Sequence, residues 1–119
     1  MRFMLMDRVR PGADEAAMPN DEQMAAMGTF MEENQGILHS TEGLHPTATG
    51  VRVTLSEDGQ NSVTTGPFTD SISNFAIIHA DSEEAAVEHA KAWLKIWGKG
   101  ETEIRRVVEE EDLAEMMQQ

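Results

Sequence analysis

The chain has no cysteine and no tyrosine, and its aromatic residues are limited to two Trp and four Phe among 119 residues. The absence of cysteine excludes disulfides and thiolate metal sites, and it fits a reducing cytoplasm. No apolar run approaches the roughly 18 residues of a membrane-spanning helix, and the apolar start of the chain ends at Asp7, too early for a signal sequence. These absences predict a single soluble domain. We expect a cytoplasmic protein without a membrane partner.

Basic residues are also scarce, with nine Lys and Arg against 22 Asp and Glu and a formal net charge of -13. Because attraction to phosphate requires a basic face, the sequence predicts no binding to nucleic acid or to anionic membranes. Nine Met take up much of the apolar share. Met fills irregular gaps but specifies shape poorly, so we expect a core formed mainly by Ile, Leu, Val, Phe and Trp.

The usual catalytic and cofactor motifs are missing as well. The sequence contains no Gly-rich phosphate loop and no G-x-S-x-G elbow. The chain has four histidines, His39, His45, His79 and His89. No two of them have the i, i+4 helical spacing that is typical of metal ligands. We therefore predict neither a metal site nor a cofactor.

Hydrophobic patterning predicts strand, helix and strand in the first part of the chain. Residues 3–6 are apolar on both faces, as in a buried central strand. A loop over residues 8–19 follows, and Asn20 with Gln23 forms a capping-box pattern at the start of a helix that Gly36 ends. Residues 37–44 then predict a second strand.

The remainder of the chain predicts a hairpin, a buried strand, a helix and a last strand. Residues 51–55 alternate between apolar and polar, and an Asp-Gly turn precedes the returning segment 61–64. Residues 75–80 form a buried strand that leads directly into a helix with Asp81 at its N-cap and Gly98 at its end. A last strand covers residues 101–108. The acidic tail, residues 109–119, could form a short helix or be disordered.

This order is the split βαβ plan of a ferredoxin-like α+β fold, with a hairpin inserted before the second half. We expect two helices to cover one face of an antiparallel sheet. The other face must also be hidden, because the strand at residues 3–6 is apolar on both sides. We therefore predict a homodimer whose sheets face each other, a dimeric α+β barrel, with residues 1–108 as the domain and 109–119 as a tail.

The segment Thr65–Asp70 is the first candidate binding site. Glycine supplies backbone freedom and proline restricts φ, so Gly66 and the proline after it predict a rigid turn that directs Phe68 and Asp70 toward a ligand. Thr65 could offer a hydroxyl group to the same ligand. The alternative is a structural turn in which Phe68 is a core anchor and Asp70 binds local backbone N–H groups.

Glu42 and His45 are the candidate catalytic residues. A carboxylate among apolar strand residues acquires a raised pKa when it is half-buried, which suits a general base, and the neighbouring imidazole titrates near neutrality. The alternative is a loop carboxylate that caps backbone amides or pairs with an arginine.

Four segments resemble the YCII-related, DGPF-domain proteins, in the same order along residues 2 to 108. Residues 42–49, EGLHPTAT, resemble the family segment GEGL-x-PSATA, and residues 65–70, TGPFTD, resemble the signature DGPFAE. Residues 77–85, IIHADSEEA, resemble LIDVDSLDEAL, and residues 103–107, EIRRV, resemble VEVRPV.

The resemblance implies ferredoxin-like subunits in a dimeric α+β barrel, with a pocket between the helix layer and the sheet or near the dimer seam. Most members have no established activity. A polar pocket with a His-Asp pair suggests an enzyme for some, and others are encoded beside or fused to extracytoplasmic-function sigma factors. Here Thr65 replaces the signature Asp, and the run KE-x-x-GG is shortened to residues 71–74. Loss of that carboxylate removes the most obvious acid/base candidate.

Two functions are therefore expected. The first is a small-molecule-binding homodimer whose polar pocket is lined by Glu42, His45, Thr65, Phe68 and Asp70, with Glu42 as the base if the protein is an enzyme. The second is a non-catalytic regulatory or protein-interaction module of the sigma-factor-associated type, with the acidic tail as its docking segment.

Overall fold

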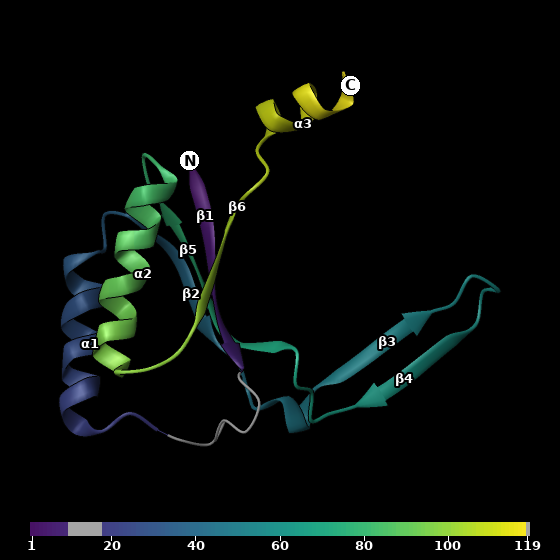
Figure 1. Ribbon diagram of the computed structural model, residues 1–119, viewed down its shortest axis with the longest axis horizontal. Helices are drawn as coiled ribbons and strands as arrows, with labels where there is room; N and C mark the ends of the chain where they lie inside the picture. Colours follow the sequence, from purple (N-terminus) through teal and green to yellow (C-terminus); the bar gives the residue numbers. More distant parts are fainter. Residues whose placement is uncertain (10–17, 119) are drawn as a thin grey trace.

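The computed structural model describes residues 1–9 and 18–118 (Figure 1). Most of the loop expected over residues 8–19 lies outside the described residues. The elements, in chain order, are β1 (Arg2–Val9), α1 (Asp21–Glu33), β2 (Leu38–Gly43), a 3-10 turn (Thr47–Thr49), β3 (Val51–Leu55), β4 (Asn61–Thr65), β5 (Ser71–His79), α2 (Glu83–Trp97), β6 (Thr102–Arg106) and α3 (Glu110–Met117).

The main sheet has the antiparallel strand order β2-β5-β1-β6, and α1 and α2 lie together on one of its faces (Figure 1). The α+β fold and the helix cover on one face are as the sequence predicts. Strand β1 continues through Val9 rather than ending at Asp7, and β5 begins at Ser71 rather than near residue 75. The two extensions pair with each other beyond a register shift between Asp7 and Arg8.

The helix ends follow local capping chemistry. Asn20 accepts a hydrogen bond from the backbone N–H of Gln23 at 2.8 Å, and the Gln23 side chain accepts one from the N–H of Asn20 at 2.9 Å, which confirms the expected capping box. Helix α2 is capped by Ser82 and not by Asp81 as expected, because the helix begins one residue later and the Ser82 hydroxyl accepts from the N–H of Ala85 at 3.1 Å.

The core lies between the sheet and α2. Successive strand residues point to opposite faces, so Phe3 and Leu5 of β1 point toward the helices and Asp7 follows on that face. The buried apolar residues are Phe3, Leu5, Ile78, Ala86 and Ala90. No residue of α1 is fully buried. None of the described helices is both long and apolar enough to cross a membrane.

The opposite face of the sheet is uncovered in a single chain (Figure 1). Met4 lies directly opposite Ile77, and Met6 directly opposite Phe75, so these four side chains share that face. We call this surface, Met4, Met6, Phe75 and Ile77, the open face. The expectation that a second subunit covers it stays a prediction.

Strands β3 and β4 form a separate two-stranded sheet that projects from the body (Figure 1). Every residue of both strands is exposed. We call residues 51–65 the hairpin arm. With the arm included, the chain measures 51 × 41 × 19 Å along its principal axes.

The arm is joined to the body at a tightly packed base. A Cβ atom on Gly66 would lie 1.8 Å from the Thr47 carbonyl oxygen, so only glycine fits there. The backbone N–H of Gly66 donates to the Gly50 carbonyl at 2.9 Å, and that of Phe68 donates to the Thr47 hydroxyl at 3.1 Å. The Gly66–Pro67 peptide bond is cis. The expected rigid turn therefore holds the arm against the 3-10 turn.

The acidic tail forms helix α3, which extends away from the sheet (Figure 1). The Arg2 side chain donates to both oxygens of Glu109, at 2.7 and 3.2 Å. Hydrogen bonding from Arg2, together with the positive charge of its guanidinium, lowers the pKa of the Glu109 carboxyl. The apolar side chains Leu113, Met116 and Met117 are exposed.

Replacing Gly66 by alanine should destabilise the protein, because the new methyl group meets backbone atoms that cannot move aside. The expected loss in the free energy of unfolding is about 2 kcal/mol, within the range for overpacking, measured by chemical denaturation. Gly43→Ala is the matched control, since no atom lies within 4 Å of its added Cβ, and its effect should stay within about 0.5 kcal/mol. Equal effects would contradict the packing at the arm base.

Candidate functional site

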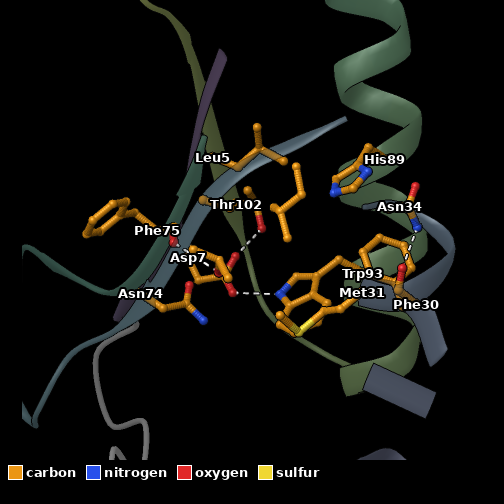
Figure 2. A pocket seen from close by; sticks show the side chains of 13 residues that line it. Leu5, Asp7, Phe30, Met31, Asn34, Asn74, Phe75, His89, Trp93 and Thr102 are labelled. Carbon is orange, nitrogen blue, oxygen red and sulfur yellow. Dashed lines mark hydrogen bonds between the residues drawn. The ribbon is translucent and has the colours of Figure 1, made fainter. Parts of the chain in front are cut away.

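A pocket lies between the helix layer and the sheet (Figure 2). Its volume is about 50 Å³, room for a few water molecules at about 10–15 Å³ each. It is lined by Leu5, Asp7, Phe30, Met31, Asn34, Leu38, Thr41, Asn74, Phe75, Ala76, His89, Trp93 and Thr102. The ring of Phe75 points away from the pocket, toward the open face (Figure 2). A ring-sized ligand requires rim side chains to move, and Met31, a flexible and partly exposed residue, is suited to do so.

Asp7 is the polar centre of this pocket. Its Oδ2 accepts a hydrogen bond from the indole Nε1 of Trp93 at 2.9 Å, and its Oδ1 accepts one from the Thr102 hydroxyl at 2.6 Å (Figure 2). The carboxylate therefore links β1 to α2 and to β6. Each carboxylate oxygen has two lone pairs, so Asp7 can still accept hydrogen bonds from a ligand.

An aromatic wall from α1 and α2 stands opposite the sheet. The Phe30 ring lies 4.8 Å from the His89 ring and 5.7 Å from the Trp93 ring, between centroids. His89 is half-buried, and this desolvation lowers the pKa of its imidazole. His89 is therefore a neutral imidazole at pH 7, with one ring nitrogen able to accept a proton.

The sequence-predicted catalytic residues lie outside this pocket. Glu42 is exposed on β2 and pairs with Phe75, so its side chain is on the open-face side of the sheet. His45 is exposed in the loop that follows β2. The structure does not test the expected catalytic roles of Glu42 and His45, which stay a prediction.

The sequence-predicted ligand-binding residues, Thr65, Gly66, Phe68 and Asp70, lie together at the base of the arm. The guanidinium of Arg52 lies 4.0 Å from the centroid of the Phe68 ring, and it donates to the Asp70 carbonyl at 2.9 Å. The Asp70 carboxylate forms an ion pair with Arg8. In one chain these contacts are local packing at the turn, and a ligand-binding role there stays a prediction.

Asp7 and His89 are the pocket residues that sequence reasoning missed. Two signals were present. Asp7 follows an apolar strand without a turn residue. His89 lies on the apolar stripe of α2 with Ala86 and Trp93, which are three and four residues away. A polar side chain on a core-facing stripe needs a partner or a function.

No group of three or more metal-binding side chains occurs within residues 1–9 and 18–118. The closest arrangement is His39 with His79, whose ring nitrogens lie 3.2 Å apart across β2 and β5. Two exposed imidazoles joined by a hydrogen bond explain this pair without a metal.

Trp93→Phe should destabilise the protein, because it removes the N–H that binds Asp7 while keeping an aromatic ring. The expected loss is about 1–2 kcal/mol, typical of a hydrogen bond to a charged group, measured by urea denaturation. Trp97→Phe is the control, since the Trp97 indole nitrogen is buried without a hydrogen-bond partner in the described part of the chain. Equal losses in both variants would contradict the role of the Asp7 link.

The lowered pKa of His89 predicts how stability depends on pH. Between the ordinary pKa of about 6.5 and the lower folded value, the unfolded chain binds more protons, so the free energy of unfolding falls as the pH decreases through this range. His89→Gln should flatten this part of the profile. His45→Gln, outside the pocket, should leave it unchanged, and an identical slope in wild type and His89→Gln would contradict the buried imidazole.

Comparison with known proteins supports the fold. The solved structure of 5-chloro-2-hydroxyhydroquinone dehydrochlorinase (TftG) from Burkholderia phenoliruptrix AC1100, in complex with 2,5-dihydroxybenzoquinone, is similar with a TM-score of 0.53, over 93% of this chain and 97% of that chain. The identity is 18%, so the likeness concerns the fold alone. No curated protein matches the sequence. The model of the YCII-related domain matches residues 1–111, and the chain therefore belongs to the YCII-related family.

Proposed function

We propose that the protein binds a small cyclic organic molecule in the pocket between the helices and the sheet, and that His89 and Asp7 contact it. One observation carries the proposal: a neutral, half-buried imidazole and an anchored carboxylate line the same aromatic-walled pocket (Figure 2). Apolar pockets with a few convergent polar groups and perturbed pKa values are the usual form of a small-molecule site.

The chemistry of the lining defines the ligand class. Phe30 and Trp93 offer ring faces for a planar ring. Asp7 offers free lone pairs to hydroxyl groups on that ring. A hydroxylated aromatic or quinone-like molecule satisfies both, and the TftG structure, a complex with 2,5-dihydroxybenzoquinone, supports this class through a shared fold.

If the bound molecule is turned over, His89 is the group that accepts a proton from it. Burial lowers the pKa of His89 and leaves the imidazole unprotonated at neutral pH, which is the form that a general base requires. Asp7 has a different task. Because both of its oxygens already bind side chains of the protein, it orients the ligand from a fixed position.

We further propose that the functional unit is a homodimer in the cytoplasm, in which the open faces of two sheets pack together. The apolar character of Met4, Met6, Phe75 and Ile77 supports this arrangement. Glu42 lies beside that surface, so the site expected from the sequence would line the seam between two copies.

A non-catalytic interaction module is the second candidate. Helix α3 favours it, because Leu113, Met116 and Met117 are exposed on an acidic helix that is held by the Arg2–Glu109 ion pair. A stoichiometric partner that is lost on removal of residues 109–119, in a protein without any stabilising ligand, would favour this candidate.

Ligand binding can be tested with a panel of hydroxylated aromatic acids, phenols and quinones. A ligand of the folded state raises the melting temperature, and calorimetry then gives its Kd. We expect Asp7→Asn and His89→Gln to weaken binding by about 10–100-fold, the cost of losing a hydrogen bond to a buried polar group.

Glu42→Gln is the matched carboxylate control and should leave the Kd within about twofold of wild type, since its side chain lies outside this pocket. Melting curves without ligand separate lost binding from lost stability. Unchanged binding in Asp7→Asn and His89→Gln, with binding lost in Glu42→Gln, would move the site to the open-face side.

A further inference from the structure

We infer that the hairpin arm is an intermolecular docking element whose apolar face packs on a second copy of this chain. The side chains of Val51, Val53, Leu55 and Val63 share one face of the arm with Asn61 and Thr65, as the pairing of Val53 with Val63 requires. Val53 and Val63 are 68% and 66% exposed. This face carries no ionisable side chain, although the chain as a whole has a net charge of -13.

An arm of this kind is not stable in isolation. A two-stranded hairpin in water is marginal at best and needs a third strand or a packing surface. Each strand of the arm has five residues and therefore extends about 17 Å. The arm projects from the body of its own chain and joins it at its base (Figure 1). There the Arg52 guanidinium lies over the Phe68 ring. Arg52 pairs with Thr64 on the opposite face of the arm, so the apolar face requires another surface.

The base of the arm is built to hold a fixed direction. Gly66 fits against Thr47 only because it has no side chain, and its backbone N–H donates a hydrogen bond to the Gly50 carbonyl. A rigid arm loses little conformational entropy when it binds. The sequence predicts the Gly-Pro segment as a wall of a ligand pocket. We infer that its role is to orient the arm.

The amount of excess surface fits a second copy. The chain exposes 8807 Å², whereas a compact monomer of this mass exposes about 6,400 Å². The radius of gyration is 17.0 Å, compared with about 13–14 Å for a compact domain of this length. The excess of about 2,400 Å² per chain, or about 4,800 Å² for two chains, lies within the total of about 2,000–5,000 Å² that obligate homodimer interfaces bury.

Each chain also supplies both halves of the contact. It carries a projecting apolar arm and an uncovered apolar sheet face, and two copies related by a two-fold axis can satisfy both surfaces reciprocally. Two chains with strongly negative charge repel each other at long range, and the apolar face of the arm adds no acidic side chain to their contact. This inference rests on the proposed homodimer and adds the arm to it.

Paired substitutions on the two faces of the arm test the inference in the full-length protein. Val53→Lys with Val63→Glu places an ion pair across the apolar face, and Thr54→Lys with Ser62→Glu places the same pair across the opposite face. Both variants keep the net charge and a favourable cross-strand pair, so the hairpin itself is preserved. Sedimentation equilibrium measures the dimer Kd, and circular dichroism and thermal melting verify folding.

We expect wild type and the Thr54→Lys/Ser62→Glu variant to dimerise with similar Kd values. The Val53→Lys/Val63→Glu variant should dimerise at least about 100-fold more weakly, because charges on both arms must be desolvated in the contact. Equal Kd values in all three proteins would overturn the arm inference and leave the sheet-face homodimer intact. A wild type that is monomeric at every concentration would overturn both, and binding of ligand in the helix-side pocket would remain separately measurable.

Discussion

Helix cover on only one face of the sheet is the constraint on which the rest of this structure depends. The buried apolar residues of the described chain all lie on the helix side of the sheet or in α2; they are Phe3, Leu5, Ile78, Ala86 and Ala90. Folding costs about 1–2 kcal/mol of conformational entropy per residue. The hydrophobic burial in so small a core offsets little of this cost. The apolar open face and the hairpin arm are the surfaces through which additional burial is available.

Strand β1 contributes side chains to both faces of the sheet. Its alternation places Phe3 and Leu5 in the core and Met4 and Met6 on the open face, while Asp7 ends the core-facing row as the polar centre of the pocket. Because Asp7 binds both Trp93 and Thr102, the pocket is part of the packing between helices and sheet. A ligand there would contact a carboxylate that two side-chain hydrogen bonds hold in place, as precise recognition requires.

Local signals explain why much of the fold could be predicted from the sequence. The Asn20–Gln23 capping box, the helix stop at Gly98 and the Asp-Gly turn of the hairpin each depend on residues close in the chain. The predicted N-cap of α2 was wrong by one residue. Asp81 and Ser82 are both good N-cap residues, and the geometry of the first turn decides between them.

The candidate site could not be predicted in the same way. Asp7 and His89 are far apart in sequence and line the same pocket only because β1 packs against α2, whereas Glu42, His45 and the segment 65–70 belong to short local motifs. The alternating pattern of residues 51–55 also could not predict that the hairpin projects away from the main sheet. Alternation predicts a strand with one apolar face, but it does not indicate which surface that face packs against.

We propose that two copies of the chain bury the apolar surfaces that a single chain leaves exposed, the open face and the hairpin arm. The most direct measurement is the melting temperature of the unmodified protein over about a hundredfold range of concentration, because a folded state that requires association is stabilised by mass action. We predict a melting temperature that rises steadily with protein concentration. A melting temperature that stays the same at every concentration, together with the sedimentation behaviour of a single chain, would contradict the account.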